Sequence, residues 1–203
     1  MKKQLILTKS MILDSDCSLY LKLRVYRMFT TYQSIVLEKG DVPRSVVVNL
    51  DAAAFNSMSG VAMSDVLGVS RQTWAKYKQM LVKPKLHYNS LDEHFTLMPF
   101  EVFDMFIVWL DTVAATFNAK EALLRFYCYM YFHAGQFQGE YQQSQENIAI
   151  ELGTSVKLIN QRLKLLRDAG WLERRGTYKF TGDQTWCYKY AVPEHLRATE
   201  IFN

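Results

Sequence analysis

The sequence predicts a mainly α-helical fold with small β-hairpins, divided into two domains that span residues 1–99 and 100–203. Apolar residues recur at helical spacing over much of the chain, which indicates amphipathic helices. The stretches 64–81 and 149–166 align without gaps, and each leads into a basic segment with the pattern of a hairpin. Because no Ser/Gly/Pro-rich linker interrupts the chain, we expect the two domains to pack tightly through an apolar helix.

The composition is that of a folded protein whose positive charge is unevenly distributed. Hydrophobic residues make up 49% of the 203 residues and aromatic residues 14%, enough apolar surface to offset the entropy lost on folding. The net charge of +4 is weak evidence for a nucleic-acid partner. However, residues 71–87 hold five Lys and Arg side chains and no acid, and residues 153–190 hold eight against three acids. Each basic region adjoins a candidate helix-turn-helix.

The N-terminal part of the chain is predicted to begin with a strand and a helix. The first ten residues alternate loosely between apolar and polar, as in an edge strand. Apolar residues at helical spacing predict a helix over 18–40 that ends at Gly40, a suitable C-cap. In the stretch 45–58 the valines favour a strand and the alanines favour a helix, and both alternatives stay open.

Two short helices are predicted over 63–81, followed by a hairpin over 83–99. The hairpin is indicated by the turn-forming residues Asn89, Ser90 and Asp92, which lie between two short apolar runs.

A strongly apolar helix is predicted over 100–116. Its apolar residues cover nearly every face, so we expect it to lie between the domains or in the interface of a homodimer. Glu101, Asp104 and Asp111 interrupt the apolar run, and carboxylates at that density are too costly for a bilayer span. We therefore expect no membrane partner. A further helix is predicted over 119–133.

The stretch 144–192 has the pattern of a helix-turn-helix followed by two strands. Ser144 and Ser155 are suited to cap the two helices, and Gly153 allows the left-handed conformation that a tight turn requires. The inner faces of the two helices are formed, at helical spacing, by Ile148, Ala149, Leu152, Ile159, Leu163 and Leu166.

Mostly polar and basic side chains gather on the outer face of the second helix and on the strands. Such side chains can donate hydrogen bonds to base edges and to phosphates. On the helix, the candidate DNA-binding residues are Ser155, Val156, Lys157, Asn160, Gln161 and Lys164. On the strands, which are joined near residues 181–184, the candidates for the DNA backbone are Arg174, Arg175, Lys179 and Lys189.

This stretch resembles the winged-helix branch of the helix-turn-helix proteins, whose pattern is S-x-x-x-[IL]-A-x-x-L-G-x-S…L…L…G-[WL]-[IL]. The matching residues are Ala149, Gly153, Ser155, Ile159, Leu163, Leu166, Gly170, Trp171 and Leu172. The resemblance implies two tandem winged-helix domains that bind double-stranded DNA. It further implies that 155–167 is the recognition helix in the major groove and that the hairpin tip near Gly182 and Asp183 is the wing.

The N-terminal copy departs from the C-terminal one in two positions. Lys78 stands at the place of the core residue Leu163, and Ser64 replaces Ala149. The copy either reads DNA itself or is a degenerate copy used for dimerisation. As a DNA reader it would use the outward residues Ser70, Arg71, Gln72 and Lys76.

A chain with two such domains loosely resembles the replication initiators of plasmids and phages and the DnaD-type N-terminal module. The resemblance implies a sequence-specific DNA-binding protein of a plasmid, phage or conjugative element. Binding at a replication origin or at a transfer origin (oriT), and transcriptional regulation, are separate uses of the same surface. The alternative of another class is a protein-protein interaction adaptor that docks through the helix 100–116.

The sequence gives no sign of a catalytic, cofactor or metal site. It has no P-loop, no GxGxxG and no GxSxG, and His87 and His94 have no partners at zinc-ligand spacing. Cys17, Cys128 and Cys187 are widely spaced and form no CxxC pair, which fits reduced thiols in the cytosol. We therefore expect a cytoplasmic protein without enzymatic activity, cofactor or metal.

Overall fold

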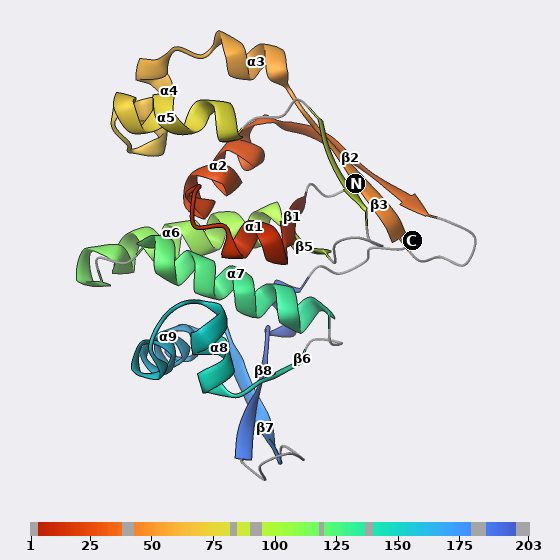
Figure 1. The fold of residues 1–203 in the computed structure, drawn as a ribbon, viewed down its shortest axis with the longest axis vertical. Helices are drawn as coiled ribbons and strands as arrows, with labels where there is room; N and C mark the ends of the chain where they lie inside the picture. Colours follow the sequence, from red (N-terminus) through yellow and green to blue (C-terminus); the bar gives the residue numbers. More distant parts are fainter. Residues whose placement is uncertain are drawn as a thin grey trace.

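A computed structural model of the chain describes residues 4–37, 43–81, 85–89, 95–117, 120–136, 140–179 and 186–197 (Figure 1). As predicted, the described chain is mainly helical and carries small antiparallel sheets. Figure 1 shows helix α7 (Lys120–Gln136) across the middle of the molecule, with N-terminal elements on one side and C-terminal elements on the other.

The N-terminal part combines two small sheets with short helices. One sheet pairs β1 with β5, and the other has the strand order β2-β3-β4. The elements are β1 (Gln4–Thr8), α1 (Lys9–Leu13), α2 (Leu19–Phe29), β2 (Thr30–Leu37), β3 (Pro43–Leu50), α3 (Ala52–Ser57), α4 (Gly60–Leu67), α5 (Arg71–Leu81), β4 (Lys85–Asn89) and β5 (Phe95–Pro99).

The helix predicted over 18–40 is wrong in its second half. α2 ends at Phe29, and the chain continues as strand β2, which pairs with β3. Residues 30–37 are rich in β-branched and aromatic types, which favour strands once a partner strand is present. The stretch 45–58 contains both alternatives, because its valines lie in β3 and its alanines begin α3. Gly40 lies outside the described residues.

The hairpin predicted over 83–99 does not form. β4 pairs with β3, whereas β5 pairs with β1 and places Ile6 opposite Leu97. The side chains of Thr96, Leu97 and Met98 are buried. Strand β5 therefore gains more from burial in the core beside β1 and α7 than it would from its neighbour along the chain. A three-stranded sheet replaces the wing that was predicted for the N-terminal copy.

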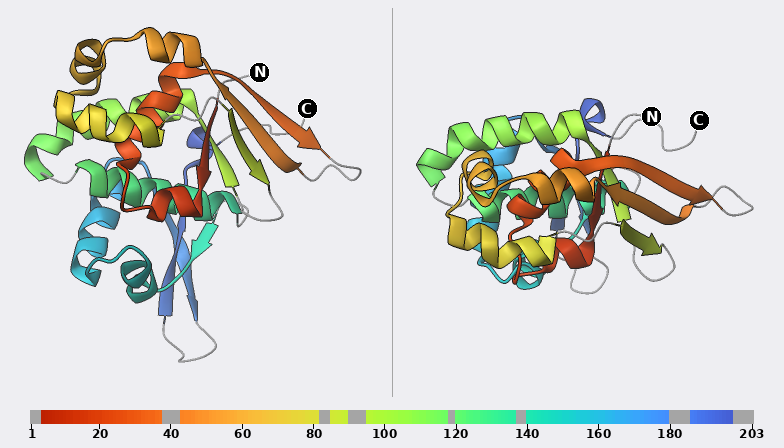
Figure 2. Two further views of the ribbon diagram at one scale, coloured as in Figure 1. Left: turned by 45° about the horizontal axis from the view of Figure 1, so that its top comes forward. Right: turned by 90° about the horizontal axis from the view of Figure 1, so that it is seen from above.

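The C-terminal part places a helix pair between one short strand and a hairpin. Its strands form one antiparallel sheet in the order β6-β8-β7. Figures 1 and 2 show the hairpin β7–β8 projecting from the body beside α8 and α9. The remaining elements are α6 (Phe100–Phe117), β6 (Glu140–Gln142), α8 (Gln145–Glu151), α9 (Val156–Asp168), β7 (Glu173–Lys179), β8 (Trp186–Ala191) and the 3-10 helix η1 (Glu194–Leu196).

The helix predicted over 100–116 forms as α6, but it is not covered on every face. Met105 and Val108 are 55% and 68% exposed. Asp104, one of the acids in its apolar run, receives hydrogen bonds from Arg27 of α2, the shortest of them 2.7 Å long. α6 nevertheless contacts both parts of the chain, because the rings of Phe106 and Trp109 also meet Trp171, with centroids 5.0 Å and 5.9 Å apart. The expectation that this helix lies between the domains or in the interface of a homodimer stays a prediction.

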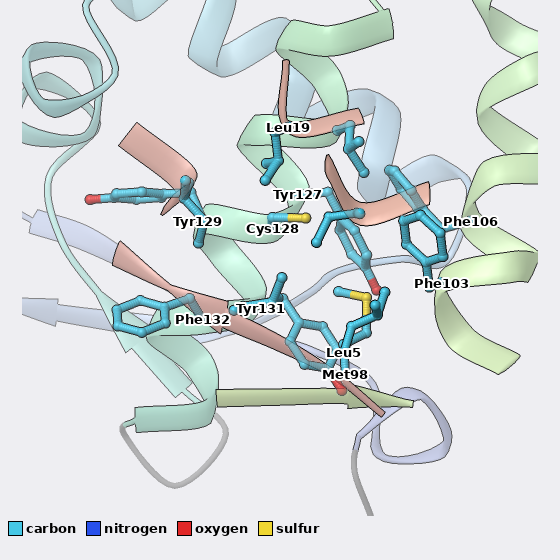
Figure 3. Packing of buried hydrophobic residues seen from close by; sticks show 14 of the residues in the cluster. Leu5, Leu19, Met98, Phe103, Phe106, Tyr127, Cys128, Tyr129, Tyr131 and Phe132 are labelled. Carbon is cyan, nitrogen blue, oxygen red and sulfur yellow. The ribbon is translucent and has the colours of Figure 1, made fainter. Parts of the chain in front are cut away.

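Helix α7 is buried along most of its length (Figure 3). Every side chain from Phe126 to Phe132 is buried. Strands β1 and β5 and helices α1 and α2 pack on one side, and β6, β8 and α9 pack on the other. The rings of Phe106 and Tyr127 stack with centroids 4.1 Å apart. One cluster of buried side chains thus includes residues on both sides of the predicted domain boundary between residues 99 and 100. The division of the chain into two domains at this point stays a prediction.

Glu121 at the start of α7 caps helix α2. Its carboxylate accepts hydrogen bonds from Ser18 Oγ at 2.8 Å and from the backbone N–H groups of Leu19 at 2.8 Å and Tyr20 at 3.1 Å. These N–H groups belong to the first turn of α2 and have no partner within the helix. The negative charge also interacts favourably with the positive end of the helix dipole.

Arg125 completes this attachment one turn further along α7. Its guanidinium donates to Glu121 Oε1 at 2.7 Å and to the carbonyl of Asp14 at 2.7 Å. The carbonyls of Ile12 and Cys17 also accept from Arg125. Polar contacts therefore reinforce the apolar packing of α1 and α2 on α7.

Replacing Glu121 with alanine should lower the free energy of unfolding by about 2–3 kcal/mol, because the N–H groups of α2 and the Arg125 guanidinium lose a charged acceptor. Urea denaturation measures this change. The control is Glu101→Ala on the exposed face of α6, which should cost less than about 1 kcal/mol. Equal losses in the two variants would contradict the capping role of Glu121.

Candidate nucleic-acid interface

The two helix-turn-helix pairs, α4–α5 and α8–α9, begin with the same capping arrangement. Ser59 Oγ accepts a hydrogen bond from Ala62 N at 3.1 Å, and Ser144 Oγ accepts one from Asn147 N at 3.1 Å. Each serine therefore satisfies an N–H group that the first helical turn leaves free.

The second helices of the two pairs also begin alike. Ser70 Oγ accepts a hydrogen bond from Thr73 N at 3.0 Å, and Ser155 Oγ accepts one from Leu158 N at 3.3 Å. Both serines are exposed candidates for DNA binding, and both use the hydroxyl oxygen to cap their helix.

A left-handed glycine joins the helices in each pair. Gly68 has a φ of 65° and Gly153 a φ of 57°, a conformation that side chains with a Cβ atom adopt only at a cost. The residue after each glycine donates its N–H back to the first helix, at 3.0 Å in the first pair and 2.9 Å in the second. The two stretches that align in the sequence thus share the same turn geometry.

The two departures of the N-terminal copy are accommodated in its packing. Ser64 is buried, and its hydroxyl donates to the carbonyl of Gly60 at 2.6 Å. Lys78 is half-buried, and its ammonium lies 5.6 Å from the centre of the Phe55 ring. Trp74 supplies the buried contact of α5, packed against Phe55 at 5.6 Å.

The outer face of α9 carries exposed donors that no other part of the described chain engages. Lys157, Asn160, Gln161 and Lys164 are exposed, and among the described residues none of them has a hydrogen-bond or ion-pair partner. Val156 is half-buried and packs against the core, so it belongs only partly to this face. The opposite face is buried, as predicted, and consists of Ile159, Leu163 and Leu166.

The structure separates the basic residues that were predicted on the strands. The guanidinium of Arg174 lies over the ring of Tyr188, 4.6 Å from its centre. Tyr188 shares a face of β8 with the core residue Tyr190, because side chains alternate along a strand. Lys189 lies on the opposite face, where its ammonium is 3.6 Å from Glu140 Oε2. Arg174 and Lys189 therefore do not act on one surface.

Arg175 and Lys179, the other two candidates on the strands, also have different surroundings. Arg175 is paired within its own strand, since its Nε lies 3.1 Å from Glu173 Oε2. Lys179 is exposed, and the strand register places it on the face that carries Tyr188. The tip of the wing, predicted near residues 182–183, lies outside the described residues.

The candidate residues of α5 and of the position before it are all exposed, namely Ser70, Arg71, Gln72 and Lys76. Lys76 places its ammonium 5.2 Å from the ring centre of Tyr77. Helices α4 and α5 lie at the opposite end of the long axis from α8 and α9, and both pairs lie on the same side in Figure 1 and in the left view of Figure 2.

Sequence reasoning did not single out three exposed side chains in the C-terminal part of the chain. Tyr188 could have been found from its alternation with Tyr190 along β8. Ile150 and Leu158 are 77% and 42% exposed, and their positions outside the buried stripes of α8 and α9 were the available signal. Exposed apolar groups beside a recognition helix can contact the thymine methyl group.

Several titratable groups of the described chain are buried. Cys17 and Cys128 are buried, unpaired thiols, and burial raises the pKa of both. His133 stacks on Tyr141 at 4.4 Å, and burial lowers its pKa to about 4, so it is neutral at pH 7. The described residues include no group of three His, Cys, Asp or Glu side chains that could hold a metal ion.

Comparison with known proteins gives no match, whether with family models, with curated proteins or with solved structures. Within the described chain, every helix is too short or too polar to cross a membrane. The geometry of the two helix pairs and of the hairpin is therefore the basis for assigning a function.

Replacing Gly153 with alanine should lower the free energy of unfolding by about 1–2 kcal/mol, and Gly68→Ala should do the same. The cost lies in the backbone, because an added Cβ would meet no atom within 4 Å at either glycine. Gly60→Ala is the matched control, since its Cβ would make an ordinary contact with Trp74 at 3.9 Å. Urea denaturation measures the free energy of unfolding of each variant. If Gly60→Ala lowered it as much as Gly153→Ala does, the role of the left-handed turns would be contradicted.

Proposed function

We propose that this chain is a sequence-specific, double-stranded DNA-binding protein, with α9 as its recognition helix and the hairpin β7–β8 as its wing. The observation that carries this proposal is the outer face of α9, whose exposed lysine and amide side chains have no partner among the described residues. The order α8, α9, β7, β8 agrees with the winged-helix resemblance of residues 144–192.

The chemistry of this face suits the major groove. The amides of Asn160 and Gln161 can donate and accept at once, which matches the N6 and N7 atoms of adenine. Lys157 and Lys164 can reach guanine or the phosphates. Because Ile159 and its neighbours on the opposite face are buried, these side chains project from a helix that is firmly held.

The N-terminal pair α4–α5 is proposed as a second DNA contact. It has the same serine caps and the same glycine turn as α8–α9, and Arg71 and Lys76 are exposed on its second helix. Since both pairs lie on the same side of the molecule in Figure 1, one chain could place two helices on one duplex.

The proposed role is binding at a replication origin, at a transfer origin or at an operator of a plasmid, phage or conjugative element. The three uses share one surface and differ in the DNA site. Repeats upstream of the gene's own promoter would favour regulation of transcription. Iterons or a nick region beside the gene would favour replication or conjugation.

The adaptor alternative has one observation in its favour. Met105 and Val108 are exposed on α6, next to each other on the helix at a spacing of one turn. A protein partner could cover them without any contribution from α9. Such an adaptor would bind its partner in the absence of DNA and would select no sequence.

Selection of bound duplexes from a random-sequence library tests the proposed function. Several rounds should enrich a common sequence, and the enriched duplex should bind more tightly than a shuffled duplex of the same composition. Recovery of a random pool after those rounds would contradict sequence-specific binding.

Asn160→Ala and Gln161→Ala should each weaken binding to the enriched duplex by about 1–3 kcal/mol and should weaken binding to the shuffled duplex much less, because amides read base edges. Fluorescence anisotropy measures both affinities. Lys189→Ala is the control that should leave both unchanged, since Lys189 pairs with Glu140. Equal losses on the two duplexes would show that the amides do not read sequence.

Footprinting tests the second contact. The unmodified chain should protect two segments about one helical turn apart. The double change Arg71→Ala and Lys76→Ala should erase one of them, whereas Lys157→Ala and Lys164→Ala should erase the other. An intact footprint after the first double change would make α4–α5 a degenerate copy.

A further inference from the structure

Arg174 differs from the other basic residues of the hairpin in its surroundings. Arg175 and Lys189 each have a carboxylate partner, at 3.1 Å and 3.6 Å. Arg174 is exposed, and in the described part of the chain it has no carboxylate within ion-pair distance. Its guanidinium lies on the ring of Tyr188 instead, 4.6 Å from the ring centre. The positive charge of Arg174 is therefore held in place without being neutralised.

A line of contacts connects this pair to the helix-turn-helix. Tyr188 meets Tyr190 at a ring distance of 6.3 Å. The hydroxyl of Tyr190 accepts a hydrogen bond from Gln145 Nε2, at 3.4 Å, and Gln145 is the first residue of α8. The hairpin cation is thus tied to the start of α8 through two aromatic rings.

A second guanidinium, from α9, acts electrostatically on Tyr190. Burial raises the pKa of Tyr190, and the positive charges of Arg167 and Arg174 act in the opposite direction. Arg167 comes from the last turn of α9, and Arg174 comes from β7. Positive charges from α9 and from the hairpin thus both act on Tyr190.

We propose that Tyr188 is a positioning residue whose ring holds the Arg174 guanidinium ready to bind one phosphodiester group of duplex DNA, between the helix-turn-helix and the wing. This inference rests on the proposed function. A guanidinium stacked on an aromatic face leaves its N–H edge free for two parallel hydrogen bonds to phosphate oxygens. Because the side chain is already ordered, binding costs less conformational entropy.

The pairing of Tyr188 with Arg174 predicts which changes matter. Tyr188→Phe keeps the ring and should change affinity by less than about twofold, whereas Tyr188→Leu should weaken binding about three- to fivefold. Arg174→Ala should weaken binding about tenfold and reduce the slope of log Kd against log salt by about one unit. Arg175→Ala is the matched control, with a change below about twofold because that residue is paired with Glu173.

A double-mutant cycle separates positioning from a structural role. Tyr188→Leu should have no further effect once Arg174 is alanine, because the ring acts through the guanidinium. The enriched duplex and the shuffled duplex should be affected alike, since a phosphate carries no sequence. Far-UV circular dichroism and thermal unfolding check that each variant is folded. Arg174→Lys tests the role of the guanidinium without altering Tyr188. This variant should lose most of the affinity that Arg174 contributes, and it should keep the slope of log Kd against log salt.

Two results would overturn the inference. The first is a loss from Tyr188→Leu that is the same with arginine or alanine at position 174, which would show that the ring acts independently. The second is an Arg174→Lys variant that binds as tightly as the unmodified chain. Failure of the unmodified chain to bind any duplex would refute the proposed function and this inference together. Normal binding with an additive cycle would refute the inference alone.

Discussion

Helix α7 carries a continuous run of buried side chains, from Phe126 to Phe132, and must therefore be covered on every face. No single layer of structure can do this. The N-terminal strands and helices cover one side, and the C-terminal sheet and α9 cover the other. Since burial of one large apolar side chain is worth about 1.5–3 kcal/mol, the two parts of the chain stabilise each other through this one helix. The networks of Glu121 and Arg125 then fix how α2 meets it.

The same helix sets the position of the candidate DNA-binding surface. Tyr129 on α7 shares a hydrogen bond of 2.8 Å with Tyr141 of β6 and donates to Glu151 Oε2 at 3.1 Å. Glu151 is the last residue of α8, directly before the turn, and it also pairs with Lys9 of α1 at 2.9 Å. These contacts join α1, α7 and the helix-turn-helix. The orientation of the outer face of α9 therefore depends on residues of α1, α7, β6 and α8 that lie outside this face.

Local signals in the sequence predicted the local features well. Gly153 and the serine caps specify their turn and helix ends by backbone geometry alone, and the spacing of Ile159 and its partners specifies which face of α9 is exposed. Features that depend on contacts between residues far apart in the sequence could not be predicted from local signals. Strand β5 pairs with β1 rather than with its neighbour β4, and residues 30–37 become a strand because β3 is beside them. The stacking of Arg174 on Tyr188 and the neutralisation of Lys189 by Glu140 likewise depend on strand register, which no short motif encodes.

The salt dependence of duplex binding by the unmodified chain tests the central claim most directly. If the α9 face and the hairpin bind DNA through Lys157, Lys164, Arg174 and Lys179, log Kd should rise linearly with log salt with a slope of at least about 3, because each phosphate contact contributes about 0.9. Contacts by Arg71 and Lys76 of α5 would add to this slope. Fluorescence anisotropy between about 50 and 200 mM salt covers the useful range. A slope near zero, or no binding to duplex DNA at the lowest salt, would contradict the account.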